Sequence, residues 1–452
     1  MSILLKSLYK TFEGGSYHNY LKQKRIRKLK LVEIQKIQWS KLKELLEFVY
    51  NSSVFYHNNF KSIGLTPQDI KTYEDFSKLP IVNKQILKKN YKEIITKGSN
   101  EKDYYTSYTS GSTGEPFSFL IDKKREDPST GVAFMLNMEN IGIDPFEKMN
   151  KLMIKAEPVN VIKDLNKPNK QTLVHRLKYK FFSETFGIRS TDIKKENIKA
   201  IYSIIKKNNI EIIYGYSSNI FYLAKLLKTH NLEVKLKYVI LIAEGILKQQ
   251  KDLIKNTFHC PVFMDYGASE CMRMGFECNQ HNGYHMDLYN YYFEYLDDNG
   301  KPVKTGDNAN IIVTNLNNYI FPLIRYNVGD QGIISKEICT CGVNYPLVSQ
   351  ITGRQADIIK TPSGDELSLS NISVLFEYLY EYITNYQVIL DKKTNTIIIK
   401  IIPAKDIKPD IIKETKEQIS KLINHSMDIK IELVEKIPFE EHGKTKTLII
   451  KS

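Results

Sequence analysis

Apolar residues in the first hundred positions recur at helical spacing. In Trp39–Tyr50 they fall at Leu42, Leu45, Leu46 and Val49, on one face of a helix. From about residue 196 the pattern changes, and amphipathic helices alternate with short apolar strands. The expected helices are Ile198–Ile205, Ile220–Leu227 and Lys248–Phe258, and the expected strands are Ile210–Tyr214, Tyr238–Ile242 and Val262–Tyr266. This alternation predicts a mostly parallel sheet with helices packed on it.

The predicted strands end in small, polar, turn-forming residues. These ends are Gly215–Ser217, Ala243–Gly245 and Gly267–Glu270. In open α/β sheets the ligand crevice lies beyond the carboxyl ends of the strands. We therefore expect a binding site at this edge of the sheet.

Two later stretches have a different character. Tyr292–Leu296 and Lys301–Val303 flank Asp298–Gly300 and predict a hairpin in an antiparallel or barrel-like section. After Arg354 the pattern predicts strands Tyr386–Leu390, Thr396–Ile402 and Lys430–Val434 and a helix over Pro409–Asn424. The predicted fold class is α/β. A large N-terminal domain, residues 1–356, has mostly parallel sheets plus the barrel-like section, and residues 357–452 form a small α+β domain.

Composition narrows the class of protein. Hydrophobic residues are 42% of the 452 positions, which excludes disorder as the main state. No run of about 18 apolar residues is present, so no membrane span is expected. Lysines interrupt the short apolar part of Met1–Phe12, so no secretion signal is expected. We expect a soluble, cytoplasmic protein.

The chain is basic, with 65 Lys and Arg against 51 Asp and Glu, a net charge of +14. Such a balance concerns anionic partners and not the fold. The densest basic cluster is Lys22, Lys24, Arg25, Arg27, Lys28 and Lys30. It lacks the interleaved aromatic residues of a single-strand platform, so no specific nucleic-acid partner is expected. A solvated helix face is one interpretation, and anion binding is the other.

One segment combines glycines with hydroxyl side chains. Tyr108–Pro116 reads YTSGSTGEP, and its core holds Thr109, Ser110, Gly111, Ser112, Thr113 and Gly114. Glycines let backbone N–H groups approach an anion, and the hydroxyls add donors. The loop suits phosphate oxygens, although it lacks the spacing and lysine of a Walker A loop. An ordinary flexible loop is the alternative interpretation.

Cysteine and histidine residues gather in two short segments. The first reads GFECNQHNGYHMD and holds Cys278, His281 and His285, and the second holds Cys339 and Cys341. Two tight turns of soft ligands in a reducing compartment are typical of structural Zn²⁺, which takes four Cys or His ligands. The preferred set is Cys278, His285, Cys339 and Cys341, with His281 as a substitute. Unligated thiols remain the alternative.

Further motifs follow the hydroxyl-rich loop in a fixed order. Asp265–Glu270 reads DYGASE, Arg325–Asp330 reads RYNVGD, Gly353–Asp357 reads GRQAD, and Gly443-Lys444 lies near the end. This set resembles the adenylate-forming enzymes, the superfamily of acyl-CoA synthetases. Within it the chain looks most like the phenylacetate–CoA ligase family and its capsular-polysaccharide branch. Leu45–Asn59 and Lys78–Lys84 also look like that branch.

The resemblance implies a role for each motif. Thr109–Gly114, with Thr113 among the catalytic residues, would hold the β- and γ-phosphates of ATP. The adenine pocket would comprise Ala243, Glu244, Asp265, Tyr266, Gly267, Ala268 and Ser269, with Tyr266 against the base. Glu270 would bind Mg²⁺, Asp330 the ribose hydroxyls, and Arg354 the ribose or phosphate. Lys444 would contact the carboxylate and the α-phosphate during catalysis.

The chain departs from the superfamily pattern at three places. Glu115, Pro116 and Phe117 stand where many members have a lysine. Only one acid, Asp357, follows the Gly-Arg pair, and the match around Lys444 is short. These departures bear most on the phosphate loop and on the catalytic lysine.

The implied reaction has two steps. A carboxylate attacks the α-phosphate of MgATP to give an acyl adenylate, and coenzyme A then takes the acyl group. The small C-terminal domain is expected to be mobile and to swing about Asp357 between the steps. A homodimer would be usual for such relatives. One alternative is transfer of the acyl group to an amine such as an amino sugar, and another is a non-catalytic, zinc-stabilised anion-binding protein.

Overall fold

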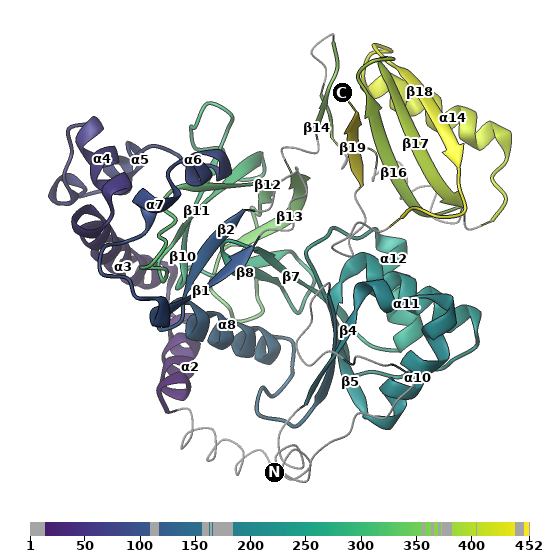
Figure 1. The fold of residues 1–452 in the computed structure, drawn as a ribbon, viewed down its shortest axis with the longest axis horizontal. Coiled ribbons are helices and arrows are strands. Elements are labelled where there is room, and N and C mark those ends of the chain that lie inside the picture. The colour runs from purple at the N-terminus through teal and green to yellow at the C-terminus, as the bar shows by residue number, and fades with distance from the viewer. Residues whose placement is uncertain are drawn as a thin grey trace. The chain divides into compact units, whose positions relative to one another are not determined.

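The computed structural model describes residues 14–108, 117–155, 162, 165, 184–354, 358–362, 366–368, 372, 382–403, 405–438 and 447–451. The chain divides into two compact units (Figure 1). The first contains Met1–Glu147 and Asp265–Thr352, and the second contains Lys148–Met264 and Gly353–Ser452. The boundary that we predict near Asp357 remains a prediction.

The first unit begins with helices. They are α2 (Gly14–Ile26), α3 (Leu31–Ser52), α4 (Val54–Ser62), α5 (Tyr73–Ser77), α6 (Lys84–Lys89) and α7 (Tyr91–Ile94). In α3, Ile34, Leu42, Leu45 and Val49 are buried at helical spacing, as the apolar pattern predicts. The two-stranded sheet of β1 (Tyr104–Tyr108) and β2 (Ser118–Asp122) and helix α8 (Glu126–Asn140) follow.

The sheet of the first unit is antiparallel in each strand pair whose register is described. Its strands run in the order β10-β11-β12-β13-β9-β8-β7. Their bounds are β7 (Val262–Ala268), β8 (Met272–Glu277), β9 (Tyr284–Met286), β10 (Tyr291–Leu296), β11 (Asn308–Asn315), β12 (Tyr326–Ile334) and β13 (Leu347–Arg354). The antiparallel section that the sequence predicts is therefore present.

The predicted hairpin around Asp298–Gly300 is present, although its second strand is short. Pro302 forms an antiparallel bridge with Leu296, and the N–H groups of Asp297 and Val303 donate to the carbonyls of Lys301 and Tyr295 at 2.8 and 3.1 Å. The ladder partner of β10 is β11, in a register that sets Tyr292 opposite Thr314. Asp298–Gly300 forms the turn, and β10 thus pairs both with the short segment after the turn and with β11.

The second unit begins with a parallel sheet. Strands β3 (Asn150–Lys155), β4 (Thr185–Arg189), β5 (Ile210–Tyr216) and β6 (Tyr238–Ile242) lie in the order β6-β5-β3-β4, all parallel. The helices are α10 (Ile198–Lys207), α11 (Ser217–Thr229) and α12 (Lys248–Phe258). In α10, Ile198, Ile201, Ile204 and Ile205 are buried while Lys206 and Lys207 are exposed. The predicted alternation of helix and parallel strand is confirmed.

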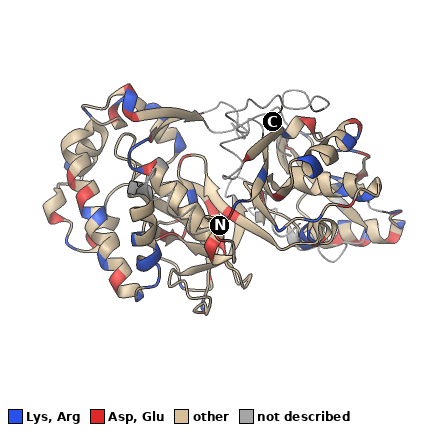
Figure 2. Ribbon diagram, turned by 90° about the horizontal axis from the view of Figure 1, so that it is seen from below, with Lys and Arg blue, Asp and Glu red and all other residues tan. Residues whose placement is uncertain are grey.

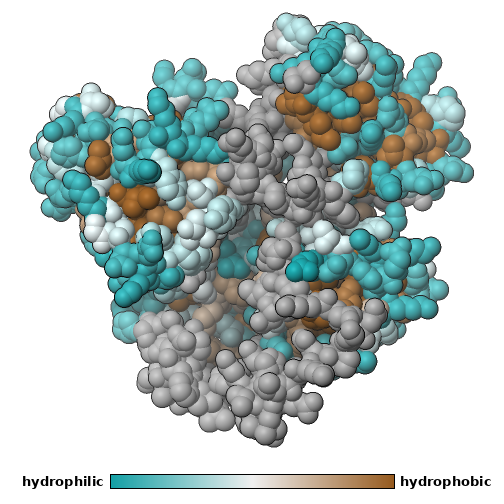
Figure 3. All heavy atoms as spheres, in the orientation of Figure 1, coloured by the Kyte–Doolittle hydropathy of each residue, from teal (hydrophilic) through white to brown (hydrophobic). Residues whose placement is uncertain are grey.

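The C-terminal part of the second unit is α+β, as predicted. It comprises β14 (Ile358–Lys360), β15 (Glu366–Ser368), β16 (Ile383–Asp391), β17 (Thr396–Pro403), α14 (Pro409–Leu422), β18 (Asp428–Leu433) and β19 (Leu448–Lys451). The four-stranded sheet has the order β18-β17-β16-β19. Apolar surface gathers over this sheet (Figure 3), and its edge strands expose Leu433 and Ile450.

Charged residues are spread over both units with the two signs interspersed (Figure 2). In the basic cluster Lys22, Arg25, Lys28 and Lys30 are exposed, as a solvated helix face predicts. Arg27 departs from that interpretation because it is only 8% exposed and lies 6.0 Å from the centre of the Tyr345 ring. Among the described residues, none of the helices has the length and apolar character that crossing a bilayer requires.

Candidate functional site

Two predicted motifs meet in the first unit. DYGASE covers the end of β7 and the turn after it, and places Tyr266 and Glu270 four residues apart. RYNVGD opens β12, and places Tyr326 and Asp330 at the same spacing. Each motif therefore offers one tyrosine and one acid.

The two motifs exchange hydrogen bonds through these side chains. The Tyr266 hydroxyl donates to Asp330 Oδ2 at 3.0 Å. The Tyr326 hydroxyl donates to Glu270 Oε1 at 3.1 Å. The arrangement is reciprocal, because each tyrosine orients the acid that belongs to the other motif.

This contact requires a strongly curled sheet. Strands β7 and β12 are four places apart in the strand order. In a flat sheet, four strand spacings would separate them by about 19 Å. The hydroxyl–carboxylate contacts bring the two strands far closer than that. The predicted barrel-like section is therefore the feature that assembles the site.

Both tyrosines stay protonated, so their hydroxyls act as donors. Burial raises the pKa of Tyr266 well above its usual value, and the neighbouring Asp330 carboxylate adds to the effect. Burial, and then the Glu270 carboxylate, likewise raise the pKa of Tyr326 far above its usual range. A protonated phenol beside a carboxylate donates its hydrogen at neutral pH.

Asp265 faces a different partner. Its Oδ2 lies 2.6 Å from Arg273 Nε, and the Arg273 guanidinium stacks 4.3 Å from the centre of the Phe134 ring in α8. Asp265 is 6% exposed. Within the described residues its carboxylate therefore serves an internal ion pair, and its assignment to the nucleotide remains a prediction.

Gly267 sets how closely the two strands of this motif approach. A Cβ at this position would lie 1.9 Å from the carbonyl oxygen of Met272 and 3.0 Å from the Met272 carbonyl carbon. Backbone atoms cannot yield as the end of a flexible side chain can. Glycine is therefore required here by the pairing of β7 with β8.

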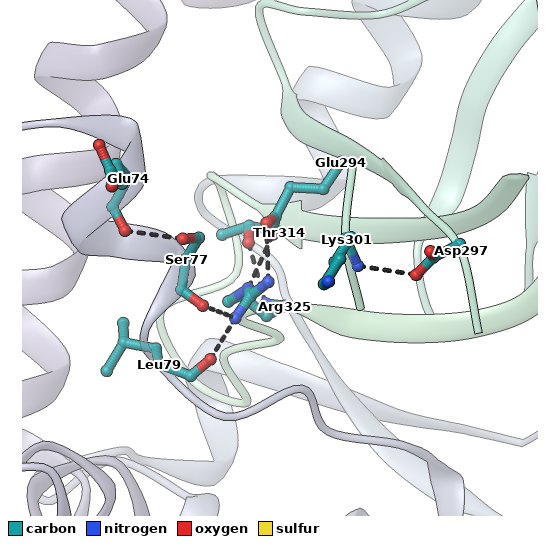
Figure 4. A network of polar contacts seen from close by, with 8 residues as sticks. All are labelled: Glu74, Ser77, Leu79, Glu294, Asp297, Lys301, Thr314 and Arg325. Carbon is teal, nitrogen blue, oxygen red and sulfur yellow. Dashed lines mark hydrogen bonds and ion pairs between the residues drawn. The ribbon is translucent and has the colours of Figure 1, made fainter. Parts of the chain in front are cut away.

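The residue before Tyr326 holds the start of β12 (Figure 4). Arg325 Nε and Nη2 each lie 2.9 Å from a carboxylate oxygen of Glu294 in β10. Its Nη1 also donates to the carbonyl oxygens of Ser77 and Leu79. The side chains of Arg325 and Glu294 are only 4% and 9% exposed. Arg325 and Tyr326 belong to the motif RYNVGD, but the sequence alone indicates no role for either of them.

Ala243 and Glu244, which the sequence predicts for the adenine pocket, lie in the second unit. Ala243 has a left-handed φ of 68° at the end of β6. Glu244 Oε2 accepts a hydrogen bond from the Ser218 N–H at 2.9 Å, and the Ser217 hydroxyl donates to the Glu244 carbonyl at 2.9 Å. The turn after β6 is thus tied to the start of α11, at the strand edge where the sequence predicts a crevice.

Several predicted site residues lie outside the described part of the chain. They are Thr109, Ser110, Gly111, Ser112, Thr113, Gly114 and Lys444. Arg354 ends β13, and its side chain is likewise not described. The strands on either side of the phosphate loop are described, with Tyr108 of β1 opposite Ser118 of β2. The roles of these residues remain predictions.

The predicted zinc ligands do come together. Cys278 follows β8, His285 lies in β9, and Cys339 and Cys341 lie between β12 and β13. The ligand atoms of these four residues all lie within 4.8 Å of one another. Cys278 Sγ is 3.3 Å from Cys339 Sγ, and His285 Nε2 is 3.1 Å from Cys341 Sγ. All five cysteines are free thiols.

The surroundings of this cluster suit a metal. His285 Nδ1 lies 2.9 Å from the Tyr345 carbonyl oxygen, which directs Nε2 toward the thiols. Burial lowers the pKa of His285 to about 4 and raises the pKa of Cys278 to about 12. The ring is therefore neutral, as a ligand must be, and a cation would favour the thiolates. His281 is not in the group, and its Nδ1 lies 2.7 Å from Glu277 Oε1.

The chain is similar to several known proteins in sequence and in fold. The family model "CapK C-terminal domain" matches residues 359–451. Protein CapK of Staphylococcus aureus is 24% identical over 446 residues, which cover 96% of this chain and 92% of that protein. Phenylacetate-coenzyme A ligase of Thermus thermophilus is 22% identical over 368 residues, which cover 80% of this chain and 79% of that ligase. A solved 2-hydroxyisobutyryl-CoA ligase in the postadenylation state has a TM-score of 0.73 at 17% identity, covering 94% and 91% of the two chains.

The fold and the homology together define the class. The chain has the fold of the adenylate-forming CoA ligases, and its homology to curated relatives supports an adenylate-forming, AMP-forming ligase. Within that superfamily it is a homologue of phenylacetate–CoA ligase and of Protein CapK. The resemblance that the motifs imply is therefore confirmed, and so is the α/β fold class.

Proposed function

We propose that the protein activates a small carboxylic acid with MgATP and then transfers the acyl group to coenzyme A. The carboxylate oxygen attacks the α-phosphorus and pyrophosphate leaves, which gives an acyl adenylate. The coenzyme A sulfur then attacks the acyl carbon, so that a thioester forms and AMP leaves. The reciprocal contact of the Tyr266 and Tyr326 hydroxyls with Asp330 and Glu270 is the observation that carries this proposal.

Each acid of that arrangement suits one part of the nucleotide. Asp330 would accept hydrogen bonds from the ribose hydroxyls, with Tyr266 against the adenine. Glu270 is 8% exposed and offers carboxylate oxygen, the ligand that a hard cation such as Mg²⁺ prefers. Bound Mg²⁺ would neutralise phosphate charge. We assign Thr109–Gly114 to the phosphates, Arg354 to the ribose or phosphate, and Lys444 to the charge that develops at the α-phosphate.

We also propose that Cys278, His285, Cys339 and Cys341 hold a structural Zn²⁺. The sulfur atoms of Cys278 and Cys339 are 3.3 Å apart, and His285 Nε2 lies 3.1 Å from the sulfur of Cys341. Three thiols and one imidazole match the soft, four-ligand donor set of closed zinc sites. Four protein ligands leave no position for a substrate. The ion would tie the loop between β12 and β13 to β8 and β9.

A second candidate keeps the first step and changes the acceptor. Protein CapK covers more of the chain, at higher identity, than the phenylacetate ligase does, and the CapK model matches residues 359–451. This favours a role in the synthesis of a capsular or surface polysaccharide. The amine of an amino sugar would then attack the acyl carbon, with formation of an amide and release of AMP.

Three measurements test these proposals. Exchange of pyrophosphate into ATP across a panel of carboxylic acids tests the first step, and no exchange with any acid would contradict it. AMP release with coenzyme A, compared with release with amino sugars, separates the two acceptors. We expect Lys444→Ala to lower the exchange rate at least 10²-fold, about 3 kcal/mol, while an unchanged rate would remove Lys444 from the reaction.

A further inference from the structure

Tyr326, a residue to which the motifs assign no role, contacts Glu270, the acid that we assign to Mg²⁺. Tyr326 is 2% exposed, and its hydroxyl meets Glu270 Oε1 at 3.1 Å. The tyrosine comes from β12 and the acid from the turn after β7. The Tyr326 hydroxyl therefore holds the Glu270 side chain in one rotamer. Without this hydrogen bond, several rotamers would be open to the side chain.

The backbone on both sides of Tyr326 is fixed. The Val82 N–H donates to the Arg325 carbonyl at 3.0 Å, and the Asn327 N–H donates to the Val82 carbonyl at 2.8 Å. Arg325 is itself held by Glu294 and by the carbonyls of Ser77 and Leu79 (Figure 4), and its N–H donates to Thr314 Oγ1 at 3.0 Å. With a φ of 49°, Arg325 turns the chain sharply into the strand. The tyrosine ring thus has a rigid base.

We propose that Tyr326 is a positioning residue that orients the Glu270 carboxylate for Mg²⁺. This inference rests on the proposed function, in which Glu270 binds the magnesium of MgATP. Magnesium demands nearly ideal octahedral geometry, and carboxylates that bind metals are themselves held by hydrogen bonds. The Tyr326 hydroxyl supplies that hydrogen bond, and Arg325 anchors the strand that carries it.

Nucleotide binding measures this effect apart from turnover. Calorimetry gives the Kd of ATP with excess Mg²⁺ and with EDTA, and the Kd in EDTA divided by the Kd with Mg²⁺ is the ratio that reports how much magnesium contributes. Tyr326→Phe keeps the ring and removes the hydroxyl. We expect it to reduce the ratio about 10-fold, with little change in the Kd measured in EDTA. An unchanged ratio overturns the proposal.

A double substitution sharpens the test. Glu270→Gln removes the carboxylate charge, so Tyr326→Phe added to it should lower the ratio no further. A further loss in the double variant would show that Tyr326 acts elsewhere, which contradicts the inference. The matched control is Tyr56→Phe, because the Tyr56 hydroxyl is also buried but donates to the Pro322 carbonyl at 2.9 Å. It should leave the ratio unchanged.

The outcomes separate the two levels of the argument. If the natural chain binds ATP equally with and without Mg²⁺ and exchanges no pyrophosphate, the proposed function fails and the inference fails with it. If the natural chain needs Mg²⁺ and Tyr326→Phe does not weaken that need, only the inference fails. Should Tyr326→Phe not fold, Glu270→Asp tests the same contact, since a shorter acid cannot reach both the hydroxyl and the cation. It should reduce the ratio as well, and an unchanged ratio would again overturn the inference.

Discussion

Arg325 and Glu294 form a two-pronged ion pair inside the first unit, with both N–O distances at 2.9 Å and both side chains less than a tenth exposed. Removing one partner of a buried pair leaves an uncompensated charge, which typically costs about 3–5 kcal/mol. We expect Arg325→Leu to lower the free energy of unfolding by that amount, as measured by urea denaturation.

Two controls give this prediction its contrast. Lys237→Ala breaks the pair with Glu211, whose side chains are 42% and 31% exposed, and should cost at most about 1 kcal/mol. Replacing Arg325 and Glu294 together by leucine should restore part of the loss. A loss from Arg325→Leu as small as that from Lys237→Ala would show that the buried pair contributes little.

Gly267→Ala should damage the site through the backbone. The added Cβ would meet the Met272 carbonyl at 1.9 Å, so β7 and β8 would have to separate. We expect a loss of about 1–3 kcal/mol in unfolding free energy, together with weaker ATP binding. Gly131→Ala is the matched control, because a Cβ there meets nothing within 4 Å and alanine favours the helix. Equal stability of the two variants would contradict this account.

Removal of the metal should loosen the loop between β12 and β13. We expect elemental analysis to find about one zinc per chain, and treatment with a strong chelator to lower Tm. Cys339→Ser should lose most of the zinc. Cys260→Ala should keep it, since Cys260 is a buried thiol outside the cluster. Protein free of zinc after mild purification, with an unaltered Tm on chelation, would remove the metal from this site.

Lys41 gives the stability a pH dependence. Its Nζ lies 2.7 Å from the Tyr289 carbonyl and 3.0 Å from Asn317 Oδ1, and burial lowers its pKa from 10.5 to about 7. Between these two pH values the unfolded chain binds the proton more tightly, so the folded state becomes more favourable as the pH rises. The slope of the unfolding free energy against pH is at most about 1.4 kcal/mol per pH unit, and this slope falls to zero below pH 7 and above pH 10.5.

Urea denaturation at pH 7.0 and at pH 9.5, for the natural chain and for Lys41→Met, isolates this term because other titrating groups cancel in the difference. The natural chain should gain stability relative to Lys41→Met at the higher pH. A difference that does not change with pH would place the pKa of Lys41 near its ordinary value.

The local pattern of apolar residues was enough to predict most of the helices and strands named in the sequence analysis. Tyr238–Ile242 and Lys248–Phe258 were predicted with the bounds that β6 and α12 have, because apolar spacing within one element decides both. The four residues of the cysteine–histidine cluster could also be chosen from the sequence, since few other side chains in the chain offer soft ligands in two tight turns. The local pattern also predicted the hairpin to Lys301–Val303, but not the longer pairing of β10 with β11, which lies further along the chain.

The features that the sequence did not predict depend on contacts between residues far apart in the chain. Arg325 reaches Leu79 across 246 positions, and Tyr326 meets Glu270 across 56. Neither contact leaves a periodic signal in the sequence. The one signal available was the shared spacing of tyrosine and acid in DYGASE and RYNVGD, and it becomes meaningful only when the curl of the sheet is known. Arg27 is similar, since nothing in a run of basic residues shows that one of them turns inward.

The crossed tyrosines also constrain how this enzyme can change. Each acid accepts a hydrogen bond from the tyrosine of the other motif. A substitution in one motif therefore changes the position of the acid in the other motif as well. A small shift of β12 would disturb both contacts at once, and with them Asp330 and Glu270, the acids that we assign to the ribose and to Mg²⁺. Altered nucleotide preference would therefore require matched substitutions in both motifs.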